Sequence, residues 1–253
     1  MNVILCENYD DLSRNAAAMI ETYVRANPTC VLGLATGGTP LGTYQKLILG
    51  HEQKGTDYSR VSAFNLDEYV GLEASHPQSY HTYMQEHLYR YINVDAIRQY
   101  IPNGKAVNME DECERYESLL DEIGPPDIQL LGIGENGHIG FNEPGSDLDG
   151  LTHTVELAES TRQANARYFP SIEDVPKRAI TMGIGSILKS KHILLLASGS
   201  RKAMAIKRLV SEEVQSTFPA SVLHQHPHVT LLVDRLAYQL VEEMKDEEKE
   251  RLG

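Results

Sequence analysis

The chain alternates short apolar, β-branched runs with longer stretches of helical spacing. NVILC is followed by residues 9–26, CVLGLA by 41–51, and VSAFNLD by 80–92. Later, HILLLA is followed by 201–210 and VTLLVD by 235–245, while DIQLLGIG and RAITMGI are further strand candidates. This rhythm predicts an α/β fold with a mostly parallel sheet and helices on both faces. HILLLA and VTLLV are continuous apolar runs, as expected of strands buried on both faces.

The composition is that of one globular domain. Of the 253 residues, 41% are hydrophobic and 23% are charged, which is enough apolar material for a substantial core. The sequence contains no internal repeat, low-complexity tract or Pro/Gly/Ser-rich linker, so we expect a single domain over residues 1–253. A formal net charge of −13 argues against nucleic acid and anionic membranes as partners, because both attract basic surfaces.

The start of the chain, MNVILCENYDDLSRN, lacks the basic first part and the long apolar core of a signal peptide. No apolar run approaches the roughly 18 residues of a membrane span. The cysteines are odd in number and widely spaced, which favours buried thiols over disulfides. We therefore expect a cytoplasmic protein.

The segment GIGENG, residues 132–137, matches the dinucleotide-binding pattern G-x-G-x-x-G directly after an apolar strand candidate. That pattern binds a pyrophosphate where a helix opens at the third glycine and turns its N–H groups toward the ligand. Here the chain continues as HIGFNEPG, and such closely spaced glycines and proline oppose a helix. The sequence thus argues against a dinucleotide cofactor.

Four polar or glycine-rich segments follow strand candidates. They are TGGTP after CVLGLA, LDEYVGL after VSAFN, GENGHIGFNEP after DIQLL, and SGSRKA after HILLLA. In open sheets of this class, ligands bind beyond the carboxyl ends of the strands. We therefore expect the four segments to converge on one pocket.

Two of these segments favour a phosphate group. TGGTP offers bare backbone and two hydroxyls, and Pro40 suits the first position of a helix, whose free N–H groups can cradle an anion. Lys202 lies in the first turn of the next helix candidate, where a cation opposes the helix dipole unless an anion compensates it. The phosphate-site candidates are Thr36, Gly37, Gly38, Thr39, Arg167 and Lys202. A simple glycine turn, a solvated lysine and a surface arginine remain the alternatives.

Carboxylates and a histidine supply candidates for proton transfer. Asp67 and Glu68 are adjacent, so only one of them should face the pocket, where it could act as a general base; caps and salt bridges are the alternative. His138 could shuttle a proton if Glu143 or Asn136 holds its other ring nitrogen. A structural histidine in a glycine-rich turn is the competing interpretation.

Two other histidine and tyrosine patterns have simpler explanations. His224, His226 and His228 alternate in LHQHPH, but no zinc-binding spacing accompanies them, so we expect no metal site. The tyrosines in HTYMQEHLYRYI, preceded by Tyr80, recur at helical spacing, which predicts a stripe facing the core: Tyr80, Tyr83 and Tyr91, together with His87.

Six blocks in order resemble the glucosamine-6-phosphate deaminase family: LGLATGGTPLGTY, FNLDEYVGL, GIGENGHIGFNEPG, TRQANARYF, ASGSRKA and PASVLHQHP. The resemblance spans essentially the whole chain. It implies a single-domain, three-layer fold related to ribose-5-phosphate isomerase. It also implies conversion of D-glucosamine 6-phosphate and water to D-fructose 6-phosphate and ammonia, without a metal or an organic cofactor.

The resemblance also implies residue roles. Asp67 matches the base that moves the C2 proton to C1, His138 the acid/base of ring opening, and Glu143 its orienting carboxylate. Asn136 stands where some members have aspartate; its carbonyl could still fix the histidine tautomer but supplies no charge. The positions that match sugar-phosphate binding are Gly37, Gly38, Thr39, Arg167 and Lys202, to which we add Thr36 and Gly134.

The main alternative is a 6-phosphogluconolactonase, which shares the fold and a similar G-x-G-x-x-G-H segment. Its relatives resemble SLFP where this chain has FNEP, which favours the deaminase. A non-catalytic sugar-phosphate-binding regulator would need neither Asp67 nor His138.

Hexameric members of the resembled family are activated by N-acetylglucosamine 6-phosphate through basic side chains after the NEP segment. Residues 144–161, PGSDLDGLTHTVELAEST, contain no lysine or arginine, and their acids would repel a phosphate: Asp147, Asp149, Glu156 and Glu159. We expect hyperbolic kinetics, no such activation, and a monomer or small homo-oligomer.

Overall fold

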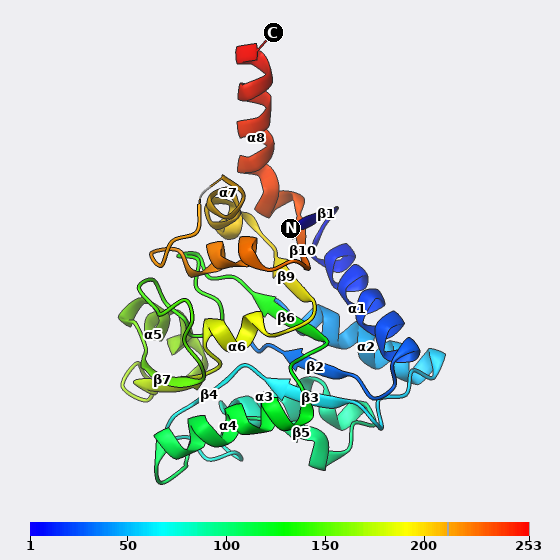
Figure 1. Cartoon of the computed structure of the whole chain (residues 1–253), viewed down its shortest axis with the longest axis vertical. Coiled ribbons are helices and arrows are strands. Elements are labelled where there is room, and N and C mark those ends of the chain that lie inside the picture. The colour runs from blue at the N-terminus through cyan, green and yellow to red at the C-terminus, as the bar shows by residue number, and fades with distance from the viewer. Residues whose placement is uncertain (212, 253) are drawn as a thin grey trace.

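The computed structural model describes residues 1–211 and 213–252, and the side chains at all of these positions except 160, 164 and 248–252. Its centre is a sheet of seven strands in which every neighbouring pair runs parallel (Figure 1). The expected mostly parallel sheet is confirmed. In spatial order the strands are β1 (Asn2–Cys6), β10 (Val229–Asp234), β9 (Ile193–Ala197), β6 (Ile128–Gly132), β2 (Val31–Leu34), β3 (Ser62–Asn65) and β5 (Gln99–Tyr100).

Helices cover both faces of this sheet and complete three layers. Leu194 and Leu196 of β9 pack into the core on one face. Ile193 and Leu195, which alternate with them, pack into the core on the other face. The first core is covered by α1 (Tyr9–Ala26), α2 (Leu41–Lys54) and α3 (Tyr80–His87). The second is covered by α4 (Met109–Ile123), α6 (Ile184–Leu188), α7 (Ala203–Ser211) and α8 (Arg235–Leu252).

A separate antiparallel sheet holds three short strands in the order β4 (Asp67–Tyr69), β8 (Arg178–Thr181) and β7 (His153–Glu156). The sequence pattern was wrong here, since it predicted VSAFNLD as one strand and RAITMGI as part of the main sheet. The chain changes sheets at Leu66. The Leu66 N–H donates to the Leu34 carbonyl of the main sheet at 3.1 Å, and its carbonyl accepts from the Met182 N–H, next to β8, at 2.7 Å.

Several helices differ from their expected bounds. The stretch 80–92 divides into α3 and a 3-10 turn, and 201–210 begins with another 3-10 turn before α7. Helix α4 was missed although it has a clear start, where Asn108 accepts the Glu110 N–H at 3.0 Å and acidic residues fill the first turn. The remaining segments are η1 (Tyr89–Tyr91), η2 (Ala96–Arg98), α5 (Glu159–Asn165), η3 (Ala166–Tyr168), η4 (Ser200–Lys202) and η5 (Pro219–Gln225).

The tyrosine stripe predicted to face the core is confirmed in part, because Tyr80 and Tyr83 are partly buried against core clusters. Tyr91 is 45% exposed, and the buried residue of α3 is Met84. Tyr80 lines the pocket described below. The Tyr83 hydroxyl donates to the Gly37 carbonyl at 2.6 Å. Helix α3 therefore borders the pocket, and its aromatic face contacts both that cavity and the core.

Buried phenols hold the strand ends that lead into the pocket. The Tyr44 hydroxyl donates to the Ala35 carbonyl at 2.5 Å, just after β2. The Tyr116 hydroxyl donates to the Asn65 carbonyl at 2.6 Å, and the Tyr89 hydroxyl donates to the Asn65 side-chain oxygen at 3.0 Å. These contacts fix the backbone immediately before the candidate site residues.

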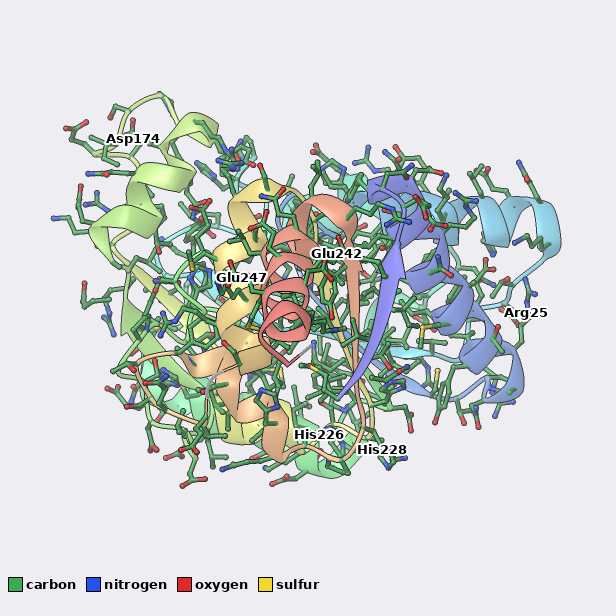
Figure 2. The ribbon with its side chains drawn as sticks, turned by 90° about the horizontal axis from the view of Figure 1, so that it is seen from above. Arg25, Asp174, His226, His228, Glu242 and Glu247 are labelled. Atoms are coloured by element: carbon green, nitrogen blue, oxygen red, sulfur yellow. The ribbon has the colours of Figure 1, made fainter. Side chains whose placement is uncertain are left out.

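Helix α8 extends away from the body of the molecule (Figure 1), and Figure 2 looks along it. Its distal half is rich in Glu and Lys, and side chains from Glu243 to Glu247 are mostly exposed. Within the described residues, no helix combines the length and apolarity needed to cross a membrane.

Candidate active site

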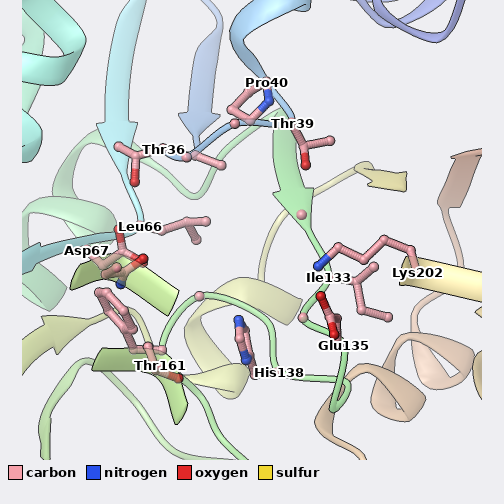
Figure 3. Close-up of a pocket in the computed structure, with 18 of the residues that line it drawn as sticks. Thr36, Thr39, Pro40, Leu66, Asp67, Ile133, Glu135, His138, Thr161 and Lys202 are labelled. Atoms are coloured by element: carbon pink, nitrogen blue, oxygen red, sulfur yellow. The ribbon is translucent and has the colours of Figure 1, made fainter. Parts of the chain in front are cut away.

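A pocket of about 490 Å³ lies beyond the carboxyl ends of β2, β3, β6 and β9. This volume suits a small metabolite. All four segments expected at this edge of the sheet contribute to it. Of the site residues predicted from the sequence, those lining the pocket are Thr36, Gly37, Gly38, Thr39, Asp67, Gly134, Asn136, His138, Arg167 and Lys202. Figure 3 shows Asp67 and Lys202 on opposite sides with His138 between them.

Asp67 begins β4 and is only 6% exposed. No hydrogen bond among the described residues ends on its carboxylate, whereas a neighbouring negative charge, Glu68, lies on the adjacent residue. Burial, followed by repulsion from Glu68, raises the pKa of Asp67 to about 8. A carboxylate of this kind exchanges protons near neutral pH, as a general base requires.

Glu68 points away from Asp67 into the protein. Its carboxylate accepts the N–H groups of Tyr80 and His81 at 2.9 and 3.1 Å, and thereby caps the start of α3. The His81 Nδ1 lies 3.0 Å from Glu68 Oε2. Only one of the two adjacent acids faces the pocket, as the alternation of side chains predicted.

His138 and Glu143 form a pair behind the centre of the pocket. Nδ1 of His138 lies 3.5 Å from Oε2 of Glu143, at the long limit of a hydrogen bond. Burial alone would raise the pKa of Glu143, but contacts from His138, Thr161 and Asn136 outweigh it and lower that pKa to about 2. Glu143 is therefore a lasting negative charge facing the imidazole, although it does not itself line the cavity.

The contacts of Asn136 differ from the one expected from the sequence. Its Oδ1 accepts the backbone N–H of His138 at 3.2 Å, and its Nδ2 donates to Glu143 Oε2 at 2.7 Å. The expectation that the Asn136 carbonyl fixes the His138 ring was therefore wrong. The tight turn aims this carbonyl at the main chain, so Asn136 instead holds Glu143, which faces the ring.

At two positions of the turn, steric constraints favour glycine over any other residue. A Cβ on Gly134 would lie 2.4 Å from the His138 ring, so the imidazole packs directly against bare backbone. Gly137 has φ of 87°, a conformation that side chains disfavour. The chain from 133 to 143 continues through turns without a helix, so the prediction that no helix opens at the third glycine is confirmed.

The turn after β2 presents free donors to the pocket. Tyr9 donates to the Gly38 and Thr39 carbonyls at 3.1 and 2.9 Å, and Tyr83 holds the Gly37 carbonyl. No hydrogen bond within the described chain occupies the N–H groups of residues 37–39. Pro40 is the N-cap of α2, one position before the expected N1. Unpaired N–H groups at a helix start are suited to bind an anion.

Three cations line this pocket: Arg167, Arg201 and Lys202. Lys202, in η4, makes no ion pair among the described residues, and its pKa is lowered chiefly by burial, with Arg201 adding and Glu135 opposing. Glu135 Oε1 lies 3.8 Å from Arg201 Nε. Arg167 reaches the same cavity from η3. An anionic group on a ligand would neutralise this cluster.

Sequence reasoning missed several lining residues: Tyr80, Glu135, Thr161, Asn165 and Arg201. Thr161 and Asn165 both lie within TRQANARYF, so the block signalled their segment but not their roles. The Thr161 hydroxyl donates to Glu143 Oε1 at 2.5 Å. The Asn165 amide donates to the Tyr69 hydroxyl at 2.9 Å.

Two of the alternating histidines contact backbone carbonyls. His226 Nε2 contacts the Ser190 carbonyl at 2.7 Å, and His224 Nε2 contacts the Leu209 carbonyl at 2.5 Å. His226 and His228 lie at one margin of the view in Figure 2. In the described part of the chain, no group of three or more His, Cys, Asp or Glu is placed to hold a metal ion.

The pocket thus joins three chemical capabilities. One end offers amides and cations for an anion, the other a carboxyl group that titrates near neutral pH, and between them stands a histidine paired with an ionised carboxylate. Together these groups can bind a small phosphorylated molecule and move protons on its far end.

Comparison with known families gives a direct match. A sequence model described as "Glucosamine-6-phosphate isomerases/6-phosphogluconolactonase" matches residues 7–232. The glucosamine-6-phosphate deaminase of a Geobacillus strain is 54% identical over 245 residues, covering 97% of this chain and 98% of the relative. Glucosamine-6-phosphate deaminase 1 of Bacillus subtilis is 52% identical, covering 95% of this chain and 99% of the relative.

Solved structures agree on the fold. The structure of a monomeric glucosamine-6-phosphate deaminase is 52% identical, with a TM-score of 0.93, and the match covers 95% of this chain and 100% of that one. A 6-phosphogluconolactonase from Trypanosoma brucei is 19% identical, with a TM-score of 0.73, over 94% of this chain and 97% of that one. The second likeness concerns the fold alone.

Proposed function

The chain belongs to the family of glucosamine-6-phosphate isomerases and 6-phosphogluconolactonases, and we infer that it is a glucosamine-6-phosphate deaminase. It converts D-glucosamine 6-phosphate and water to D-fructose 6-phosphate and ammonia. The observation that carries this assignment is the placement of Asp67 across one pocket from the His138–Glu143 pair. Such an arrangement serves a substrate that must first open its ring and then shift a proton.

We assign the first step to His138. The closed sugar opens when the proton of the C1 hydroxyl leaves, the C1 carbonyl forms, and the ring oxygen takes up a proton as its bond to C1 breaks. An imidazole can relay this proton when its second nitrogen faces a carboxylate. Glu143, at 3.5 Å from Nδ1, is ionised and stabilises the imidazolium that forms during the relay.

We assign the second step to Asp67. Its carboxylate removes the C2 proton of the open sugar while O1 takes up a proton, which gives an enol with a C1–C2 double bond. The carboxylate then returns its proton to C1 as the nitrogen forms a double bond to C2 and releases one proton, which balances the proton taken up by O1. Water then adds to the C2 imine and ammonia leaves, giving the ketose. These steps balance without an oxidant, so we expect no organic cofactor and no metal.

We assign the phosphate to the opposite end. The free N–H groups of residues 37–39 and the cations Arg167 and Lys202 are suited to hold a dianion there. Thr36 and Gly134 complete the lining between the two ends. This places C1 and C2 of an extended open chain toward Asp67.

The test is ammonia release from D-glucosamine 6-phosphate, assayed beside hydrolysis of 6-phosphogluconolactone. We expect deamination of the first compound and no hydrolysis of the second beyond its spontaneous rate. Glucosamine without its phosphate should be a poor substrate, because the cation cluster then has no ligand. Lactone hydrolysis without deamination would instead assign the chain to the other activity of its family.

The charges of the segment after Glu143 bear on the regulation and the oligomeric state of the protein. Asp147, Asp149, Glu156 and Glu159 are exposed there, and Arg178 of β8 already faces Glu156 at 3.6 Å. We therefore propose hyperbolic kinetics without activation by N-acetylglucosamine 6-phosphate, and a monomer or small homo-oligomer. Sigmoidal kinetics relieved by that sugar phosphate would contradict the first proposal, and a hexameric mass by light scattering the second. A cytoplasmic location remains a prediction.

A further inference from the structure

Thr161 links a separate element to the candidate catalytic carboxylate. It lies in α5, is 9% exposed, and its hydroxyl donates to Glu143 Oε1 at 2.5 Å. Its side chain also borders the pocket. Nothing in the sequence pattern assigned it a role.

The two oxygens of Glu143 have different tasks. Oε2 faces the His138 ring and also accepts from Asn136. Oε1 accepts from Thr161. A carboxylate can rotate about its last carbon–carbon bond, and contacts to one oxygen alone leave that rotation weakly fixed. A donor on the second oxygen determines which oxygen the imidazole meets.

Asn136 and Thr161 approach Glu143 from different parts of the fold. Asn136 belongs to the same turn as His138, whereas Thr161 comes from α5. Helix α5 is held in turn by Arg162, which donates to the Ile172 carbonyl at 2.8 Å, and by Asn165, which donates to the Tyr69 hydroxyl at 2.9 Å. Thr161 therefore holds the Glu143 carboxylate from an element outside the turn that carries His138.

We propose that Thr161 is a positioning residue for ring opening, whose hydroxyl fixes the Glu143 carboxylate so that Oε2 faces His138. The proposal rests on the proposed deaminase function. It predicts a loss in turnover of the closed sugar, since Glu143 is needed in the right orientation only when the imidazole relays a proton. Binding of a ligand that is already open should change little.

A matched pair elsewhere in the molecule separates this role from general stability. Thr152, 7% exposed, donates its hydroxyl to Glu117 Oε1, also at 2.5 Å. Glu117 lies on α4 and does not line the pocket. Replacing either threonine with valine removes one buried hydroxyl–carboxylate contact while keeping the side-chain shape.

The experiment compares Thr161→Val, Thr161→Ser and Thr152→Val with the unaltered protein. For Thr161→Val we expect kcat on D-glucosamine 6-phosphate to fall roughly tenfold to a hundredfold, the loss given by one hydrogen bond to a charged group. Thr161→Ser keeps the hydroxyl and should retain kcat within about threefold, a small fraction of that loss. Thr152→Val should lower the unfolding temperature without changing kcat.

The binding probe is the open-chain compound 2-amino-2-deoxy-D-glucitol 6-phosphate, measured by calorimetry. Thr161→Val should bind it within about threefold of the unaltered protein, a difference well under one hydrogen bond. The proposal is overturned if Thr161→Val keeps full kcat, if Thr161→Ser loses as much as Thr161→Val, or if binding of the open-chain probe falls in step with kcat. If the unaltered protein releases no ammonia, the deaminase assignment itself fails.

Discussion

Two carboxylates at the active site, Asp67 in the pocket lining and Glu143 behind His138, have environments that shift their pKa values in opposite directions. Asp67 is buried without a hydrogen-bond donor among the described residues, beside a second acid, and its pKa rises to about 8. Glu143 is also largely buried, but it receives contacts from Asn136, Thr161 and His138, and its pKa falls to about 2. Both carboxylates are buried, so the hydrogen-bond donors around each of them decide whether its pKa rises or falls.

Because their pKa values are shifted in opposite directions, the two acids are suited to different chemical roles. A group that titrates near neutral pH can take up and return a proton during turnover, whereas a group with a pKa near 2 stays charged and can only orient or stabilise a neighbour. In the proposed reaction Asp67 therefore moves the C2 proton, while Glu143 supports His138 in ring opening.

The largest effect should come from Asp67→Asn. An amide cannot accept the C2 proton, so we expect kcat to fall about 10²- to 10⁴-fold, with modest loss of substrate binding. Exchange of the substrate C2 hydrogen with solvent should disappear with it. Asp121→Asn, at an exposed acid paired with Lys189, is the matched control. Exchange at the unaltered rate in Asp67→Asn would remove this residue from the mechanism.

A loss of about 10²-fold is expected for His138→Ala, and it should fall on ring opening. An open-chain ligand should then bind nearly as well as it does to the unaltered protein. His153→Ala provides a control, because among the described residues that ring hydrogen-bonds only to the Leu151 carbonyl, at 2.8 Å, and it does not line the pocket. Equal weakening for closed and open ligands would mark His138 as structural.

The contrast also predicts stability changes of opposite sign. The pKa of Asp67 in the folded state lies above its ordinary value of 3.8, so the stability that the protonated Asp67 contributes is lost as pH rises toward about 8. Above pH 8, Asp67→Asn should therefore raise the unfolding temperature. The Glu143 pKa lies below its ordinary 4.5, so this carboxylate stabilises the fold above that pH, and Glu143→Gln should lower the unfolding temperature near neutrality. Thermal scans at several pH values check both; changes of equal sign would break the contrast.

The smallest effect should come from Glu68→Gln. Repulsion from Glu68 contributes to the raised pKa of Asp67, so removing that charge should lower the pKa and move the rising limb of the kcat/KM profile to lower pH, by up to about one unit. The substrate amine titrates equally in both forms, so the shift isolates the enzyme group. An unmoved limb would show that Glu68 does not influence Asp67.

Sequence reasoning located most of the pocket because it relied on topology. The carboxyl ends of parallel strands meet at one edge, so the segments carrying Gly37, Asp67, His138 and Lys202 had to lie near each other. The turn sequence named Glu143 and Asn136 as possible partners of His138, and the family resemblance selected Glu143. The alternating apolar runs sufficed for the main sheet.

What the sequence could not provide depends on tertiary contacts. The change of sheets at Leu66 rests on two hydrogen bonds to distant segments. Tyr80 and Thr161 reach the pocket from α3 and α5, not from strand ends. These two helices contact Tyr69 of the second sheet through the Tyr80 ring and the Asn165 amide. The opposite pKa values of Asp67 and Glu143 depend on which donors surround each carboxylate, and that is invisible in a list of residues.

The most direct test is a titration of the two carboxyl groups in the ligand-free protein, followed by ¹³C NMR with labelled Asp and Glu side chains. Signals are assigned by their loss in Asp67→Asn and Glu143→Gln. The account predicts that Asp67 titrates with a midpoint near 8 and that Glu143 remains ionised down to about 2. If Asp67 instead titrates near its ordinary value of 3.8, alongside the surface acids, the proposed division of labour is contradicted.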